Sequence, residues 1–483
     1  MSAGLPGDLP TGLLIDGAWT SAADGATVPV IDPATGDELT SIADAGPADA
    51  VAALDAASAA APGWAATPPR HRAELLRRAF DEVTRRRDEF ARLMTLEMGK
   101  PLAEAYGEVT YGSEFLRWFS EEAVRIGGRY GLNPEGTGRM VVSSRPVGPA
   151  YLITPWNFPL AMATRKIGPA LAAGCPVIIK PAANTPLTTL LLSQVLLEVG
   201  VPAGVVNVIA STRPADVTEP LLADRRLRKL SFTGSTRVGV RLLAQAAPNV
   251  LRTSMELGGN APFLIFDDAD LDAAVEGALT AKFRNIGQAC TAANRFLVHA
   301  SVAEEFLSRV TERVQSMIIG SGLDDGVTIG PLIDDKAVHS TEALVADAVD
   351  RGARLTTGGE RLDRPGYFFA PTVLADVQPG TRLLEEEIFG PVLGVTTFET
   401  EEQAVAAAND TEYGLVSYAY TRDLGRAHRL IDSLDTGMMG LNTGLVSNAA
   451  APFGGVKASG LGREGAQEGI AEYLETKYTL IPA

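Results

Sequence analysis

Cysteine and histidine are scarce in this sequence, with two cysteines and four histidines among 483 residues. Two cysteines cannot build a disulfide framework, and the scattered histidines have no spacing typical of a metal site. The sequence therefore predicts no metal centre and no fold that depends on disulfides. So few cysteines also favour a reducing compartment, and we expect the protein to be cytoplasmic.

Long apolar runs and excess positive charge are absent as well. No apolar run reaches the roughly 18 residues of a membrane-spanning helix, and the start MSAGLPGDLP lacks the basic and apolar segments of a secretory signal. The formal net charge is −17, so no cationic surface is expected that would release counterions from nucleic acid phosphates. We expect neither a membrane nor a nucleic acid partner.

A chain of 483 residues is too long for one hydrophobic core, and its pattern falls into two blocks. Residues 149–254 alternate short apolar strands with helices, which is typical of βαβ units in a mostly parallel sheet. The alternation starts again after Glu256. A Gly-rich, alternating stretch predicts a β-hairpin that packs on another subunit, and the C-terminal KYTLIPA could add an edge strand to a neighbouring sheet. We predict two α/β domains and a small β element with these boundaries: residues 1–126 with 147–255, residues 256–459, and residues 127–146 with 460–483.

One stretch places two reactive residue types just outside regular structure. Glu256 precedes a Gly-Gly turn, and Cys290 follows a predicted strand and a helix that Asp267 and Asp268 would open. A carboxylate and a thiol in such positions suggest a general base and a nucleophile. The alternative is a solvated glutamate and a buried core cysteine, which these two residues alone would favour.

Three further loops follow predicted strands, where open α/β sheets bind their ligands. Residues 154–159 (TPWNFP) carry Asn157, whose amide could donate to an oxyanion or serve only as a turn residue. Lys180 ends the next strand and could reach a ribose or phosphate, or lie along the surface. Residues 232–239 offer glycines and a helix N-terminus for a phosphate, although the G-x-G-x-x-G fingerprint is missing.

The motifs PWNFP, KP, FTGST, ELGGN, GQAC, EEIFGP and PFGGVKASGLGREG, in this order, resemble those of the aldehyde dehydrogenase superfamily over essentially the whole chain. Longer stretches such as ITPWNFPLAMATRKIGPALAAGCPV and GVTIGPLID are most similar to the succinate-semialdehyde dehydrogenases. The resemblance implies two Rossmann-like parallel-sheet α/β domains, of which the first binds the dinucleotide and the second is catalytic. It also implies a small β-hairpin oligomerisation element in a homodimer or homotetramer.

The resemblance further implies a covalent mechanism. The thiolate of Cys290 adds to an aldehyde to give a thiohemiacetal, hydride leaves to a nicotinamide, and water activated by Glu256 hydrolyses the resulting thioester. The side chain of Asn157 and the backbone N–H of Cys290 would hold the oxyanion. The expected reaction converts succinate semialdehyde to succinate. The alternative is another aldehyde, such as glutarate semialdehyde or a broad aliphatic range.

Cofactor contacts are implied at ten positions: Trp156, Asn157, Lys180, Ala183, Gly234, Ser235, Gly239, Leu257, Glu387 and Phe389. Glu387 would bind the nicotinamide ribose. Ala183 stands where NAD-selective relatives commonly carry an acid for the adenosine ribose, so a 2′-phosphate would meet no repulsion there and could pair with Lys180. We therefore expect NADP as cofactor, with NAD also accepted.

The substrate residues implied by the resemblance are Arg165, Arg284 and Ser447. A guanidinium suits a carboxylate because its planar fork donates at two points. Arg284 lies six residues before Cys290, close enough to bind the far end of a four-carbon acid. The alternative for each arginine is a structural ion pair. Ala292 stands where many relatives carry a second cysteine, so an active-site disulfide cannot form.

Overall fold

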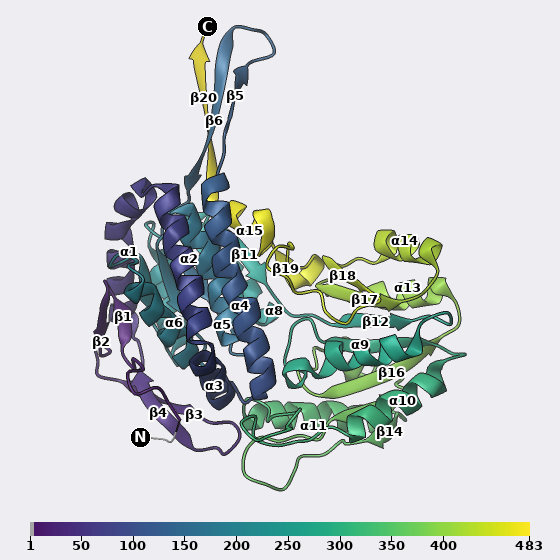
Figure 1. Ribbon diagram of the computed structural model, residues 1–483. Helices are drawn as coiled ribbons and strands as arrows, with labels where there is room; N and C mark the ends of the chain where they lie inside the picture. Colours follow the sequence, from purple (N-terminus) through teal and green to yellow (C-terminus); the bar gives the residue numbers. More distant parts are fainter. Residues whose placement is uncertain (1–3) are drawn as a thin grey trace.

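The computed structural model describes residues 4–483 and contains two sheets with helices on both faces, plus a long β-ribbon that projects from the first (Figure 1). The first sheet has eight strands in the order β19-β11-β10-β7-β8-β9-β1-β2. Its five central strands run parallel: β11 (Arg252–Glu256), β10 (Lys229–Thr233), β7 (Ala150–Ile153), β8 (Val177–Lys180) and β9 (Val206–Val208). Its edges are antiparallel: β19 (Gly460–Leu461), β1 (Leu13–Ile15) and β2 (Ala18–Thr20).

Helices pack on both faces of this sheet, and the central strands are accordingly apolar and buried on both sides. One face carries the larger core, with these helices: α2 (Pro69–Arg85), α3 (Arg87–Met98), α4 (Leu102–Glu122), α5 (Pro159–Ala173) and α6 (Leu187–Glu198). The other face carries α1 (Pro47–Ala66), α7 (Pro214–Ala223) and α8 (Thr236–Ala246). Every residue of α5 is buried, because this helix lies between the sheet and α4.

The second sheet has seven strands in the order β14-β15-β16-β13-β12-β17-β18, parallel except for β14. Their bounds are β12 (Ala261–Ile265), β13 (Ala293–His299), β14 (Arg354–Thr357), β15 (Thr372–Ala375), β16 (Val392–Phe398), β17 (Val416–Tyr420) and β18 (Met438–Leu441). One face carries α9 (Leu271–Phe283), α10 (Ala303–Gln315) and α11 (Asp335–Asp350), and the other α13 (Glu401–Asn409) and α14 (Leu424–Ser433). The short helix α12 (Arg382–Glu385) lies between β15 and β16 in sequence. The predicted fold class is confirmed.

The projecting ribbon is an antiparallel sheet in the order β20-β6-β5 (Figure 1). Its strands are β5 (Arg129–Leu132), β6 (Gly138–Pro146) and β20 (Leu474–Pro482), so the C-terminal strand pairs with a hairpin of its own chain. Residues 460–473 do not lie in the ribbon, which differs from the boundary predicted at residue 460. β19 pairs with β11 and α15 (Ala466–Ala471) packs on α5, because Ile470 and Tyr473 complete the larger core. A separate two-stranded sheet pairs β3 (Thr27–Ile31) with β4 (Glu38–Ala43).

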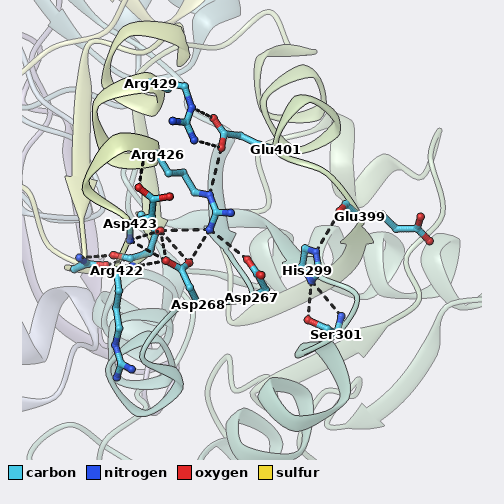
Figure 2. A network of polar contacts seen from close by, with 12 residues as sticks. Asp267, Asp268, His299, Ser301, Glu399, Glu401, Arg422, Asp423, Arg426 and Arg429 are labelled. Carbon is cyan, nitrogen blue, oxygen red and sulfur yellow. Dashed lines mark hydrogen bonds and ion pairs between the residues drawn. The ribbon is translucent and has the colours of Figure 1, made fainter.

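The predicted start of α9 was wrong, and Figure 2 shows what the two acids do instead. Asp270 caps α9, whereas the Asp268 carboxylate accepts the backbone N–H groups of Arg422 and Asp423 before α14, at 2.9 and 2.8 Å. Asp268 also pairs with Arg426 at 2.7 Å. The network ties α14 to the end of β12 through a contact that joins residues 158 positions apart.

Among residues 4–483, no helix combines the length and the apolar character needed to cross a bilayer. In the same range, His, Cys, Asp and Glu side chains nowhere gather in threes that could hold a metal ion.

Candidate active site

The nucleophile segment approaches the amino end of β13 through a strained turn. Cys290 follows the 3-10 turn η3 (Arg284–Gly287), in which Asn285 and Ile286 have left-handed φ angles of 56° and 60°. Such angles are costly for residues with side chains and persist only where neighbours enforce them. The backbone N–H of Asn285 donates to the Glu104 carboxylate on α4 at 2.6 Å. The first domain therefore helps to shape the turn that presents the thiol.

Asn157 lies between β7 and α5, and the structure brings it against the nucleophile segment. Its side-chain amide donates to the Gln288 backbone carbonyl at 2.9 Å, two residues before Cys290. Its own backbone carbonyl accepts hydrogen bonds from the Asn285 amide at 3.0 Å and from Lys100 Nζ at 2.9 Å. A primary amide has two hydrogens, so Asn157 retains one donor that could bind an oxyanion.

Lys100 and Glu108 support this loop, and the sequence analysis did not find them. They form a fully buried ion pair, and Lys100 Nζ lies 4.2 Å from the centre of the Phe158 ring. The Glu108 carboxylate also accepts the N–H groups of Leu160 and Ala161 in the first turn of α5, at 2.9 and 3.1 Å. Burial lowers the pKa of Lys100, and Glu108 opposes the shift. One buried pair thus anchors both the Asn157 backbone and the start of α5.

Glu256 ends β11 in a buried, charged environment. Only 2% of its surface is exposed, and its Oε2 atom has no hydrogen-bond partner within the described part of the chain. Burial raises the pKa of Glu256 well above its usual range, and the nearby Glu464 raises it further, while Arg165 and Lys166 lower it. Glu464 forms ion pairs with both of these cations. Glu256 is therefore a stronger base than an exposed carboxylate, with one oxygen free to accept a proton.

The Cys290 thiol is partly exposed at the residue level, yet its surroundings oppose ionisation. Burial of the sulfur raises its pKa to about 12, Arg165 opposes this, and Glu387 and Glu256 add to it. The thiol is therefore protonated in this state, and a base must take its proton before it attacks. No histidine lies among these neighbours, so the Glu256 carboxylate is the predicted candidate for this base.

Lys180 ends β8, and its side-chain amine makes few hydrogen bonds within the described part of the chain. Among the described residues 4–483, its Nζ atom donates only to the Pro181 carbonyl, at 3.3 Å. Burial lowers the pKa of Lys180 to about 8, and Asp44 opposes the shift. Ala183, in the loop that follows, contributes no charge, as predicted from the sequence. Asp44, which follows β4, is an acid near this lysine that the sequence analysis did not anticipate.

The turn after β10 leads into a helix whose first residue has no side-chain cap. Ser235 precedes α8 without capping it by its side chain, so the first N–H groups of this helix remain available to an anion. A Cβ atom on Gly239 would lie 2.3 Å from a Leu257 methyl group, and one on Gly234 2.5 Å from the Phe232 ring. Packing against these side chains therefore requires both glycines, and the helix end without a side-chain cap remains the predicted phosphate site.

The other predicted cofactor residues include two aromatic side chains and one acid. The rings of Trp156 and Phe389 meet edge to face, with centroids 5.4 Å apart. Glu387 accepts the backbone N–H of Gly259 at 3.1 Å. Burial raises the pKa of Glu387 to about 7, while the Gly259 hydrogen bond and the buried Lys282 lower it. These groups suit a ribose and a nicotinamide ring, which need hydroxyl acceptors and flat apolar walls.

The predicted substrate residues gather together, but the two arginines differ. Arg165 is buried, pairs with Glu464 and lies 4.2 Å from the Phe453 ring centre, so its charge is already compensated. Arg284 lies over the Phe158 ring at 5.4 Å, and no carboxylate within residues 4–483 comes within ion-pairing distance of it. Ser447 lines a cavity of about 420 Å³ together with Tyr111, a residue that the sequence analysis missed.

The aldehyde dehydrogenase family profile matches residues 19–479. This chain belongs to the aldehyde dehydrogenase family. It is 60% identical over 440 residues to a succinate-semialdehyde dehydrogenase of Paenarthrobacter nicotinovorans, covering 91% of this chain and 98% of that protein. It is 50% identical over 468 residues to a succinate-semialdehyde dehydrogenase [NADP(+)] of Escherichia coli, covering 97% of each chain. A glutarate-semialdehyde dehydrogenase of Pseudomonas aeruginosa is 49% identical over 464 residues, covering 96% of each.

Solved structures agree with the sequence relatives. An NADP-dependent enzyme of Escherichia coli superposes with a TM-score of 0.97 at 48% identity, covering 98% of both chains. A betaine aldehyde dehydrogenase of Staphylococcus aureus in complex with NAD+ superposes with a TM-score of 0.95 at 35% identity, covering 98% of this chain and 95% of that one. The family membership predicted from the motifs is confirmed.

Proposed function

We propose that this protein oxidises succinate semialdehyde to succinate, with glutarate semialdehyde or a broader aliphatic range as the alternative. The relatives at 50–60% identity are succinate-semialdehyde dehydrogenases, whereas the glutarate-semialdehyde dehydrogenase shares 49%. The observation that carries the proposal is the Arg284 guanidinium, which lies in the segment before Cys290 and forms no ion pair within residues 4–483. An aldehyde with a carboxylate at its far end supplies the missing counter-charge.

The chemistry takes place at the Cys290 sulfur. The thiolate adds to the aldehyde carbon, and the resulting oxyanion is held by the Asn157 side chain and the Cys290 backbone N–H. Bound nicotinamide supplies the hydride acceptor. The thioester left on Cys290 is then attacked by water, which releases succinate and regenerates the thiol.

Glu256 accepts the proton of the attacking water. Its raised pKa and its unpartnered Oε2 atom support this role. Glu256→Gln should retain the first turnover of reduced cofactor and then stall at hydrolysis of the thioester, or lose both phases if Glu256 also deprotonates the thiol. Unchanged steady-state turnover at neutral pH would contradict the role.

We infer that NADP is the preferred cofactor and that NAD is also accepted. Ala183 offers no negative charge to repel a 2′-phosphate, and in the described part of the chain the Lys180 amine has only a backbone carbonyl as hydrogen-bond partner. Asp44 acts against this preference because its charge interacts with Lys180, which is a reason to expect that NAD remains usable. Comparing kcat/KM for the two cofactors tests the inference, and a clear preference for NAD contradicts it.

We also propose an oligomeric state for the protein and a role for each domain. Residues 1–126 and 147–255 would bind the dinucleotide, and residues 256–459 would form the catalytic domain. The ribbon exposes apolar side chains, with Tyr130 65% and Tyr478 56% exposed, so a second copy that covers them supports a homodimer or homotetramer. A cytoplasmic location suits a nucleophilic thiol that must stay reduced. Light scattering after size-exclusion chromatography measures the assembly.

The decisive experiment follows absorbance of the reduced cofactor with succinate semialdehyde and with butanal, which lacks the carboxylate. Arg284→Ala should raise KM for succinate semialdehyde roughly 10- to 150-fold, as expected for about 1.5–3 kcal/mol from hydrogen bonds to a charged group. The effect on butanal should be small. Arg117→Ala is the matched control, since Arg117 lines the same 420 Å³ cavity as Ser447 but pairs with Glu114. Equal effects of Arg284→Ala on both aldehydes would rule out the anchor.

A further inference from the structure

We propose that Tyr111 is a specificity-determining residue, whose hydroxyl donates a hydrogen bond to the substrate carboxylate beside Arg284 and Ser447. The inference rests on the proposed function and extends it to a residue outside the motifs. Tyr111 lies on α4, in the first domain, whereas Arg284 and Ser447 come from the second part of the chain. The carboxylate would therefore be bound from both sides of the active site.

The Tyr111 hydroxyl is buried and lacks a partner. Its oxygen is shielded from solvent, and no atom within residues 4–483 forms a hydrogen bond with it. The Arg165 guanidinium and the Ser447 hydroxyl are near enough to interact with it, but neither meets hydrogen-bonding geometry. Buried tyrosine hydroxyls usually find a partner, so an orphan beside a cavity points to a group that binds there.

The position of the hydroxyl is well defined. The Tyr111 ring meets the Phe115 ring edge to face, with centroids 5.1 Å apart and an interplanar angle of 72°. Burial raises the pKa of Tyr111, with Arg165 and Arg284 opposing the shift. The hydroxyl is therefore protonated at neutral pH and acts as a donor. Tyr111 and Ser447 also line the same cavity of about 420 Å³.

A carboxylate needs this additional donor because Arg165 is already engaged. Its guanidinium pairs with Glu464 and contacts Met162 Sδ at 3.1 Å. Arg284 forms no ion pair among residues 4–483, and only the more distant Glu104 carboxylate acts on its charge. A carboxylate offers about four lone-pair positions, of which the fork of one guanidinium satisfies two. Desolvating the others without donors is costly. The hydroxyls of Tyr111 and Ser447 can meet this need.

The inference predicts a selective effect of Tyr111→Phe, which removes the hydroxyl and retains the ring packing on Phe115. KM for succinate semialdehyde should rise about 10-fold, with kcat and the kinetics of butanal unchanged. The dissociation constant of the product succinate, measured by calorimetry on the enzyme, should rise by a similar factor. Tyr106→Phe is the matched control, because Tyr106 lies on the same helix but contacts Arg87 instead.

The outcomes separate this inference from the proposed function. A wild-type enzyme that prefers succinate semialdehyde over butanal, together with an unchanged KM in Tyr111→Phe, would refute the role of Tyr111 and leave the function intact. Equal increases in KM for both aldehydes would also refute it, because they would indicate a general effect on the cavity. A wild-type enzyme without preference for the acid would overturn the proposed function, and the inference with it.

Discussion

Replacing Lys100 by methionine tests how the buried Lys100–Glu108 ion pair positions Asn157 in the loop between β7 and α5. The lysine amine contributes its pair with Glu108, a 2.9 Å hydrogen bond to the Asn157 carbonyl, and the contact with the Phe158 ring. Methionine fills much of the same space but leaves the Glu108 carboxylate without its counter-charge. Breaking one side of a buried pair typically costs about 3–5 kcal/mol. We expect about 3 kcal/mol here, because Glu108 keeps two backbone N–H donors from α5.

The expected effect on catalysis is smaller than loss of the amide itself. Removing an oxyanion donor typically slows a reaction by about 10²–10³. Lys100→Met retains the Asn157 amide but removes one hydrogen bond that holds its backbone, a loss of about 1.4 kcal/mol that corresponds to roughly 10-fold. Acyl-enzyme formation should therefore slow about 10-fold, while cofactor affinity stays unchanged.

The assay is the burst of reduced cofactor in the first turnover, measured in a double-mutant cycle with Asn157→Ala. If Lys100 acts through Asn157, Lys100→Met should change the burst less than about 2-fold once the amide is gone. Glu108→Gln added to Lys100→Met should restore stability but leave the burst slow. Lys229→Met is the control, because Lys229, at the start of β10, is also buried but donates to Ser254 on β11. Additive effects, or a normal burst in a destabilised Lys100→Met, would refute the reasoning.

Three further predictions concern other parts of the molecule. Glu464→Gln removes a negative charge beside Glu256 and should lower the pKa of that carboxyl group. The acidic limb of the pH profile of thioester hydrolysis, which rises as Glu256 ionises, should then move to lower pH. An acidic limb at unchanged pH would contradict the interaction between Glu464 and Glu256. Gly259→Ala should abolish aldehyde oxidation with normal circular dichroism, because its Cβ would lie 2.4 Å from the backbone oxygen of the nucleophile, whereas Gly107→Ala, in open space, should be active. Asp268→Ala should lower the free energy of unfolding by about 2 kcal/mol at neutral pH. Burial raises the pKa of Asp268, but the Thr421 hydroxyl, backbone N–H groups and Arg426 lower it overall. The stabilisation by Asp268 should therefore disappear as the pH falls below about 4. A destabilisation by Asp268→Ala that persists in acid would exclude the mechanism.

The predictions that succeeded depended on local patterns. Apolar strands alternating with helices predicted both parallel sheets, because burial on both faces demands near-continuous apolar strands. Asn157 and Lys180 were correctly placed at strand ends, since the residue after a strand is set by the strand itself. The nucleophile is different, because Cys290 lies at the amino end of its strand and was located by the motif around it.

The predictions that failed depended on contacts between distant parts of the chain. Asp267 and Asp268 have the composition of a helix start, yet Asp268 binds the α14 terminus 154 and 155 positions away. Residues 460–473 were grouped with the hairpin as an oligomerisation element, but β19 pairs with β11 at the edge of the first sheet, and Tyr473 lies in the larger core. Sequence spacing carries no record of such partners, so local rules assigned these residues to their neighbours in the chain.

By itself, the sequence determined the fold class and the family, because strand periodicity and ordered motifs are properties of short segments. The roles of Cys290 and Glu256 stay predictions from those motifs. Only the tertiary structure decided which charges are free. It paired Arg165 with Glu464, 299 positions later, left Arg284 without an ion pair among residues 4–483 and buried the Tyr111 hydroxyl within electrostatic reach of both arginines. Whether a charged group is buried or paired depends on residues from distant parts of the chain. A polar residue on a helix therefore looks the same in sequence whether it faces water or an active site.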